Sequence, residues 1–74
     1  MATPHDDWDA GDMSCGDLVL ELFLRMKRLP PHTVLRVRAT DAAAPLDIPA
    51  WCSMTGHVLL SAIPPIYLLQ TKEG

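Results

Sequence analysis

The sequence predicts an α+β fold, a two-layer β-α-β-α-β-β sandwich in which two helices cover one face of a four-stranded mixed sheet. Three patterns carry this prediction: a helical apolar row within residues 16–29, an alternating segment at 34–40, and two apolar runs near the C-terminal end. The helical crossovers make some strand pairs parallel, whereas the final pair is antiparallel. At 74 residues, 49% of them hydrophobic, we expect one domain spanning residues 1–74.

The N-terminal part of the chain is acidic and weakly patterned. Residues 1–5 show no periodicity, and we expect them to be disordered. Residues 6–13, DDWDAGDM, are predicted as a weak strand, because aspartate is depleted in strands. The formal net charge of −3 argues against direct nucleic-acid binding. No signal peptide is visible and no apolar run approaches the roughly 20 residues of a membrane span, so we expect a soluble cytoplasmic protein with no membrane contact.

The first helix is predicted from Gly16 to Leu29. Its buried row is flanked by Val19 and Phe23. The row itself consists of Leu18, Leu22, Met26 and Leu29. Pro30 and Pro31 follow at once and end the helix.

A cysteine stands at the start of this helix. Ser14 followed by Asp17 resembles a capping box, which makes Cys15 the first helical residue. A thiol at that position meets the positive end of the helix dipole, which can lower its pKa from about 8.5 to roughly 3.5–7.5. Leu20 and Leu24 fall within or beside the charged face of the helix. We interpret them either as scattered surface residues or as an apolar docking patch near Cys15.

The middle of the chain predicts a strand and a second helix. Residues 34–40 alternate, and the inward set is Leu35, Val37 and Ala39. Arg36 and Arg38 point outward, where they belong to a solvated face or steer an acidic partner. The second helix is predicted with Asp47 as its N-cap and Gly56 just past its end.

Two further strands are predicted at residues 57–63 and 66–72, joined by Pro64 and Pro65. The link has no Asn-Gly or Asp-Gly pair, so a tight type I′ turn is not indicated. Cys52 falls on the inward face of the second helix and is predicted to be a small buried hydrophobe. Sequence alone leaves a disulfide between Cys15 and Cys52 open, although a reducing compartment disfavours it.

Residues 47–57 read DIPAWCSMTGH, which resembles the DIPxWCxxxGH signature of the TusA/SirA-like sulfur carrier family. The segment ATD at 39–41 and the Asp9-Ala10 pair also resemble that family, and the likeness extends from about Trp8 to Lys72. The resemblance implies the same β-α-β-α-β-β order, similar to the C-terminal domain of bacterial translation initiation factor three.

The resemblance also implies a persulfide relay. In that family a cysteine opening a CPxP motif accepts sulfane sulfur from a cysteine desulfurase or rhodanese and passes it to a downstream acceptor protein. The corresponding residue here is Cys15, in the motif CGDL, so Gly16 and Leu18 replace both prolines and the first turn is freer. Asp12 stands where the family has glycine, and the Asp17 carboxylate would oppose ionisation of the thiol.

Two functional hypotheses follow. In the first, the chain is a sulfur carrier with Cys15 as the nucleophile. Its predicted partner-binding residues are Gly16, Asp17, Leu20 and Leu24. No cofactor is required, because the attacking group is already an anion. A metal site is not indicated either, because the three histidines, His5, His32 and His57, are dispersed.

In the second hypothesis, the chain is a diverged, non-catalytic binding or regulatory module of the same fold. Its surface would consist of Leu20, Leu24 and the basic face of the strand at 34–40. The loss of the CPxP prolines motivates this alternative. The sequence leaves open the oligomeric state and the pathway served, whether tRNA thiolation, molybdenum cofactor assembly or sulfur oxidation.

Overall fold

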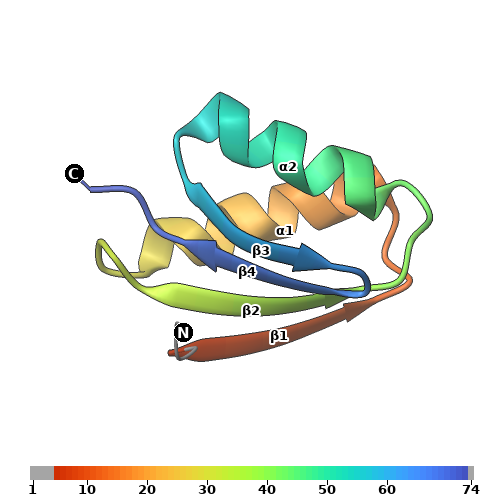
Figure 1. Cartoon of the computed structure of the whole chain (residues 1–74), viewed down its shortest axis with the longest axis horizontal. Helices are drawn as coiled ribbons and strands as arrows, with labels where there is room; N and C mark the ends of the chain where they lie inside the picture. Colours follow the sequence, from red (N-terminus) through yellow and green to blue (C-terminus); the bar gives the residue numbers. More distant parts are fainter. Residues whose placement is uncertain (1–4, 74) are drawn as a thin grey trace.

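The computed structural model describes residues 5–73, except for the side chain of Cys15. The chain forms, in order, β1 (Asp6–Gly11), α1 (Cys15–Arg28), β2 (Val34–Ala39), α2 (Ala44–Thr55), β3 (Val58–Ile63) and β4 (Ile66–Gln70). Both helices cover one face of the sheet (Figure 1). The strand order is β1-β2-β4-β3, with β1 and β2 parallel and the other two pairs antiparallel. The predicted two-layer α+β sandwich with a mixed sheet is therefore confirmed.

The start of the described chain is held by the sheet. Residues 1–4, which we expected to be disordered, lie outside the described part of the chain. His5, included in the same expectation, instead joins β2 through two hydrogen bonds: its N–H donates to the Val34 carbonyl at 2.8 Å, and its Nδ1 accepts from the Val34 N–H at 2.9 Å. The ladder between β1 and β2 thus begins before Asp6.

The core lies between the helices and the sheet. The predicted row on α1 is buried at Leu18, Leu22 and Met26, while Leu29 follows the helix and is partly buried. Phe23 was expected beside that row, but 47% of its surface is exposed. None of the helices in the described residues is long and apolar enough to cross a bilayer.

Helix α2 begins three residues before the predicted N-cap, Asp47. The Asp41 side chain accepts from the Ala43 N–H at 3.1 Å, and the Asp41 carbonyl accepts from the Ala44 N–H at 3.0 Å, so this turn already leads into the helix. The Asp47 N–H donates to the Ala43 carbonyl at 2.9 Å, which places Asp47 inside the first turn. At the other end Gly56 has a φ of 87° and ends the helix as predicted.

The two arginines of β2 lie on the face of the sheet that points away from the helices. Parallel register places each beside an aspartate of β1: Arg36 Nη1 lies 3.1 Å from Asp7 Oδ2, and Arg38 Nη1 lies 3.2 Å from Asp9 Oδ1. Such exposed pairs contribute only about 0–1 kcal/mol each. Their main effect is to neutralise the basic face, which weakens it as a surface for an acidic partner.

Candidate functional site

The candidate site lies where the parallel strands end and the helices begin. Figure 1 shows α1 and α2 both starting at this end of the molecule. Gly11 has a φ of 58°, and it turns the chain out of β1. Its carbonyl accepts from the Thr40 N–H at 2.8 Å and its own N–H donates to Asp9 Oδ1 at 2.9 Å. These bonds fix the loop that leads to Cys15.

Helix α1 begins at Cys15, as predicted. The preceding Ser14 is extended, with φ −68° and ψ 159°, and its carbonyl accepts the first helical hydrogen bond from Leu18 N–H at 2.7 Å. The predicted capping box is wrong, because Ser14 makes no side-chain hydrogen bond to the helix backbone. Its hydroxyl instead donates to Asp17 Oδ2 at 3.4 Å. The amide groups of the first turn are therefore not capped by this serine.

The surroundings of residue 15 are open. The Cys15 side chain itself lies outside the described part of the structure, so its nucleophilic role remains a prediction. Asp12, Ser14, Gly16 and Asp17 are all exposed. A Cβ atom built on Gly16 would meet nothing within 4 Å. The side of the first turn formed by Gly16 and Asp17 therefore faces solvent, where a partner protein can reach it, whereas Leu18 points into the core.

An apolar surface follows along α1. Leu20 and Leu24 are exposed, which fits both scattered surface residues and an apolar docking patch. Phe23 is also exposed, and its spacing from them places all three on one face of the helix. We call Leu20, Phe23 and Leu24 the α1 patch. Sequence reasoning missed Phe23 because it lies at the flank of the buried row. On α2, Leu46 and Met54 are also exposed.

The second cysteine has a different environment. Cys52 is a free thiol, only 3% exposed, and it packs in the core beside Trp51. Burial raises the pKa of the Cys52 thiol to about 11, because the interior disfavours the thiolate. The prediction that Cys52 is a small buried hydrophobe is thereby confirmed.

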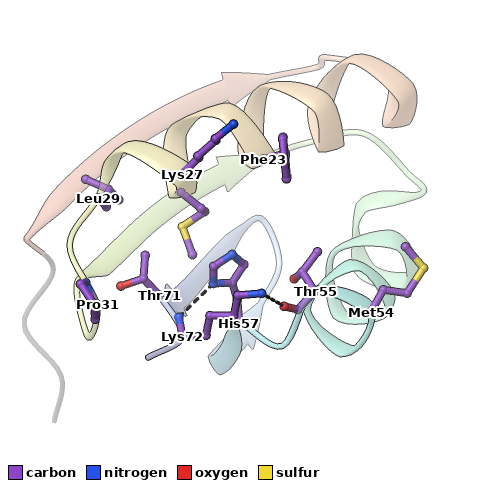
Figure 2. Close-up of a pocket in the computed structure, with 10 residues that line it drawn as sticks. Phe23, Lys27, Leu29, Pro31, Met54, Thr55, His57, Thr71 and Lys72 are labelled. Carbon is purple, nitrogen blue, oxygen red and sulfur yellow. Dashed lines mark hydrogen bonds between the residues drawn. The ribbon is translucent and has the colours of Figure 1, made fainter. Parts of the chain in front are cut away.

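A pocket of about 490 Å³ opens at the opposite end of the helices, where α1 and α2 finish. Its apolar walls include Phe23, Met26 and Met54. Figure 2 shows His57 projecting between the two helix ends, with Lys72 beneath it. Most of the lining residues come from the ends of the helices and from the segments beside them, about the length of α1 away from the predicted nucleophile. Phe23, about two turns after Cys15, belongs both to this pocket and to the α1 patch.

Two contacts hold His57 in this pocket, and a third joins its partner Lys72 to the end of α2. Its ring stacks on Trp51, with centroids 5.3 Å apart and 23° between the planes. Its Nδ1 accepts from the Lys72 N–H at 3.0 Å, and Lys72 Nζ donates to the Thr55 carbonyl at 2.9 Å (Figure 2). Burial, with a smaller contribution from the Lys72 ammonium, lowers the pKa of His57 below its ordinary 6.5. These contacts give the His57 ring a structural role.

Thr71 was not singled out from the sequence. It is buried, its hydroxyl donates to the Pro30 carbonyl at 2.6 Å, and the same oxygen accepts from the Thr33 N–H at 2.8 Å. This residue ties the end of β4 to the loop after α1. Among the described residues, no three His, Cys, Asp or Glu side chains gather closely enough to hold a metal ion.

Comparisons with known proteins agree with this architecture. The family model described as Sulfurtransferase TusA matches residues 7–70. The chain is 38% identical over 53 residues to the sulfur carrier protein TusA of Pseudomonas syringae pv. tomato, a match covering 72% of this chain and 63% of that protein. It is 36% identical over 58 residues to TusA of Pseudomonas putida strain W619, covering 78% of this chain and 72% of the relative. A putative sulfur carrier protein of Neisseria meningitidis serogroup A is 39% identical over 54 residues, 73% of each chain. The chain therefore belongs to the TusA family.

Proposed function

We propose that the chain is a sulfur carrier that accepts sulfane sulfur as a persulfide on Cys15 and passes it to an acceptor protein. The observation that carries this proposal is the position of Cys15 as the first residue of α1, beside amide groups that Ser14 does not cap. A helix start with free amides favours the thiolate, which is the form that attacks sulfur. Membership of a family whose named relatives are sulfur carriers supports the same role.

The chemistry needs no external oxidant or cofactor. The Cys15 thiolate attacks the terminal sulfur of a donor persulfide, the new S–S bond forms on Cys15, and the donor cysteine leaves as a thiolate. The terminal sulfur keeps its proton as it moves from the donor cysteine to Cys15. In the second step an acceptor thiolate attacks that terminal sulfur, and Cys15 leaves as the thiolate again. Since both steps require free thiols, we place the carrier in the reducing cytoplasm.

The motif CGDL changes the setting of this thiol. Without prolines the first turn keeps its conformational freedom, and the open space beside Gly16 gives no side chain to restrict it. The Asp17 carboxylate lies in the same turn, hydrogen bonded to the Ser14 hydroxyl. The amides of the first turn favour the thiolate and this carboxylate opposes it, so the alkylation rate of Cys15 reports which of the two effects is larger.

Docking would use the residues around this turn. The α1 patch begins one turn after Cys15, and its three apolar side chains are exposed. Together with Gly16 and Asp17 it forms a surface on which a cysteine desulfurase or rhodanese could dock as donor and an acceptor protein could dock later. Use of one surface by both partners would make the two complexes mutually exclusive.

The test is sulfur loading of the intact protein. After incubation with a cysteine desulfurase and cysteine, we expect the native chain to gain the mass of one sulfur atom, reversibly with a reducing thiol. The Cys52→Ala variant should gain the same mass, because the Cys52 thiol is buried and protonated. The Cys15→Ser variant should gain none, and a gain by that variant would refute the assignment.

Alkylation kinetics separate the carrier from the alternative module. A Cys15 thiolate populated at neutral pH should react with iodoacetamide faster than free cysteine does. A rate no faster than that of free cysteine would favour the non-catalytic module. Because Arg36 and Arg38 are paired with aspartates of β1, that module would depend on the α1 patch alone.

A further inference from the structure

The two edges of the sheet are protected differently. β1, at one edge, reads DDWDAG, and its three aspartates discourage another strand from pairing there. β3, at the other edge, reads VLLSAI and contains no charge, proline or glycine. Unpaired N–H and C=O groups on such an edge are a template for a further strand. β3 is therefore the edge open to a partner.

The apolar side chains of β3 add to this openness. Val58 is 46% exposed and Ile63 is 73% exposed. Within the sheet Val58 lies opposite Gln70, and Ile63 lies opposite Ile66. Those two residues of β4 alternate with its core residues, so Val58 and Ile63 both belong to the face of the sheet without helices.

A bulge explains how two residues five positions apart share one face. The ladder with β4 shifts between Leu59 and Ser61, which makes Leu60 the extra residue. Leu59 and Ala62 lie opposite core residues of β4 and therefore face the helices. The order of side chains is therefore the same from either end of β3. A residue on the face without helices comes first (Val58 or Ile63), a residue that faces the helices comes next (Leu59 or Ala62), and the bulge lies at the centre.

We propose that β3 pairs antiparallel with β3 of a second copy of this chain, about a two-fold axis between Leu60 and Ser61, to form a dimer with one continuous sheet. In that register Val58 lies opposite Ile63 of the second copy, and both face outward. Leu59 lies opposite Ala62 of the second copy, and both face the helices. The strand is therefore complementary to itself, as a two-fold interface requires.

The charge distribution selects this edge for a second copy. Two copies of a chain with net charge −3 repel each other, but β3 carries no charged side chain. The aspartates of the sheet, Asp6, Asp7 and Asp9, lie on β1, where Asp7 and Asp9 pair with arginines of β2. Three strand spacings, about 14 Å, separate β1 from β3, which exceeds the Debye length of about 8 Å in physiological salt. Pairing at β3 keeps these carboxylates at the outer ends of the dimer. It also leaves the start of α1 uncovered, because that segment follows β1.

The association state of the full chain under reducing conditions tests this proposal. Sedimentation velocity between about 1 µM and about 1 mM should show a reversible monomer–dimer equilibrium. Amide exchange of β3 should slow as the protein concentration rises, whereas exchange of β1 should not. Ile63→Lys and Val58→Lys should each remain monomeric at every protein concentration tested, because each places an ammonium against an apolar residue of the second copy. A two-fold interface contains every substituted residue twice, so each change introduces two such ammonium groups.

The matched control is Leu46→Lys, an exposed apolar position on α2 outside the proposed interface. It should dimerise like the native chain, and all variants should keep the native circular dichroism spectrum. A chain that stays monomeric at the highest concentration would overturn the proposal, as would a dimer that persists in Ile63→Lys. Sulfur loading on Cys15 is measured separately, so neither result affects the proposed function.

Discussion

The two ends of the helical layer differ in how firmly they are held. Where the helices begin, Ser14 does not cap α1 and the first turn is exposed. Where they finish, His57 and Lys72 join the end of α2 to the end of β4. α1 has 14 residues, so its two ends lie about 21 Å apart. The firmly held end fixes the fold, and the open end is available for chemistry.

This contrast changes the meaning of the family signature. The motif at residues 47–57 supplies core residues of α2, the glycine that ends the helix, and the locked histidine. It contains no part of the first turn of α1. This signature therefore belongs to the scaffold and lies outside the segment that bears Cys15. A strong match at one end does not by itself assign chemistry at the other.

The largest expected effect comes from Thr71→Val. This nearly isosteric change removes the hydroxyl that joins Pro30 and Thr33, and it leaves the Pro30 carbonyl and the Thr33 N–H, both in a partly buried setting, without that partner. We expect the free energy of unfolding, measured with urea, to fall by about 2 kcal/mol. Thr40→Val, at an exposed threonine, should change it by less than about 0.5 kcal/mol. If both changes lowered the free energy of unfolding by the same amount, the hydrogen bonds of Thr71 would not be stabilising the end of the molecule that contains the pocket.

A smaller, pH-dependent effect is expected from His57. Its folded-state pKa lies below the ordinary 6.5, so the unfolded chain binds a proton that the folded chain rejects as the pH falls. Stability is therefore fully present above pH 6.5 and declines as the pH drops from there through the folded pKa. His57→Asn keeps an acceptor near the position of Nδ1 without this titration, so its urea midpoint should change less over the same interval. If the urea midpoints of the native chain and of His57→Asn fell equally with pH, the pH dependence would not come from His57.

The smallest stability effect is expected at the open end, from Asp17→Asn. Loss of a carboxylate from the first turn should cost no more than about 0.5 kcal/mol. The same change should shift the pH profile of Cys15 alkylation to lower pH, because a negative charge near the thiol is removed. Asp6→Asn, at the start of β1, should leave that profile unchanged. An Asp17→Asn profile that overlays the native one would show that this carboxylate does not influence the sulfur.

Local patterns predicted most of the elements, and the errors have identifiable physical causes. Apolar periodicity located α1 and both C-terminal strands. The start of α2 was misplaced because Asp47 has the chemistry of a cap, while the turn that opens the helix is made by Asp41, six residues earlier. Exposure of Phe23 depends on where α2 packs against α1, which the pattern of one helix does not encode.

Residues whose role depends on distant partners were the hardest to predict. The pairing of Arg36 and Arg38 with aspartates follows from the parallel register of β1 on β2, which no local pattern contains. Thr71 bonds to residues about forty positions earlier, and a single threonine near the end of a strand gives no signal of this. For the candidate site, the sequence predicted the helix start and the exposed leucines, but not the failure of Ser14 to cap the helix.

The strand order has a consequence for how the chain folds during synthesis. β4 is the last strand to leave the ribosome, yet it lies between β2 and β3 and pairs with both. A nascent chain that ends before residue 66 can form the β1–β2 pair but cannot join β3 to it. We therefore expect the native sheet to assemble only after residues 66–70 have emerged, because β3 has no partner strand until β4 is present.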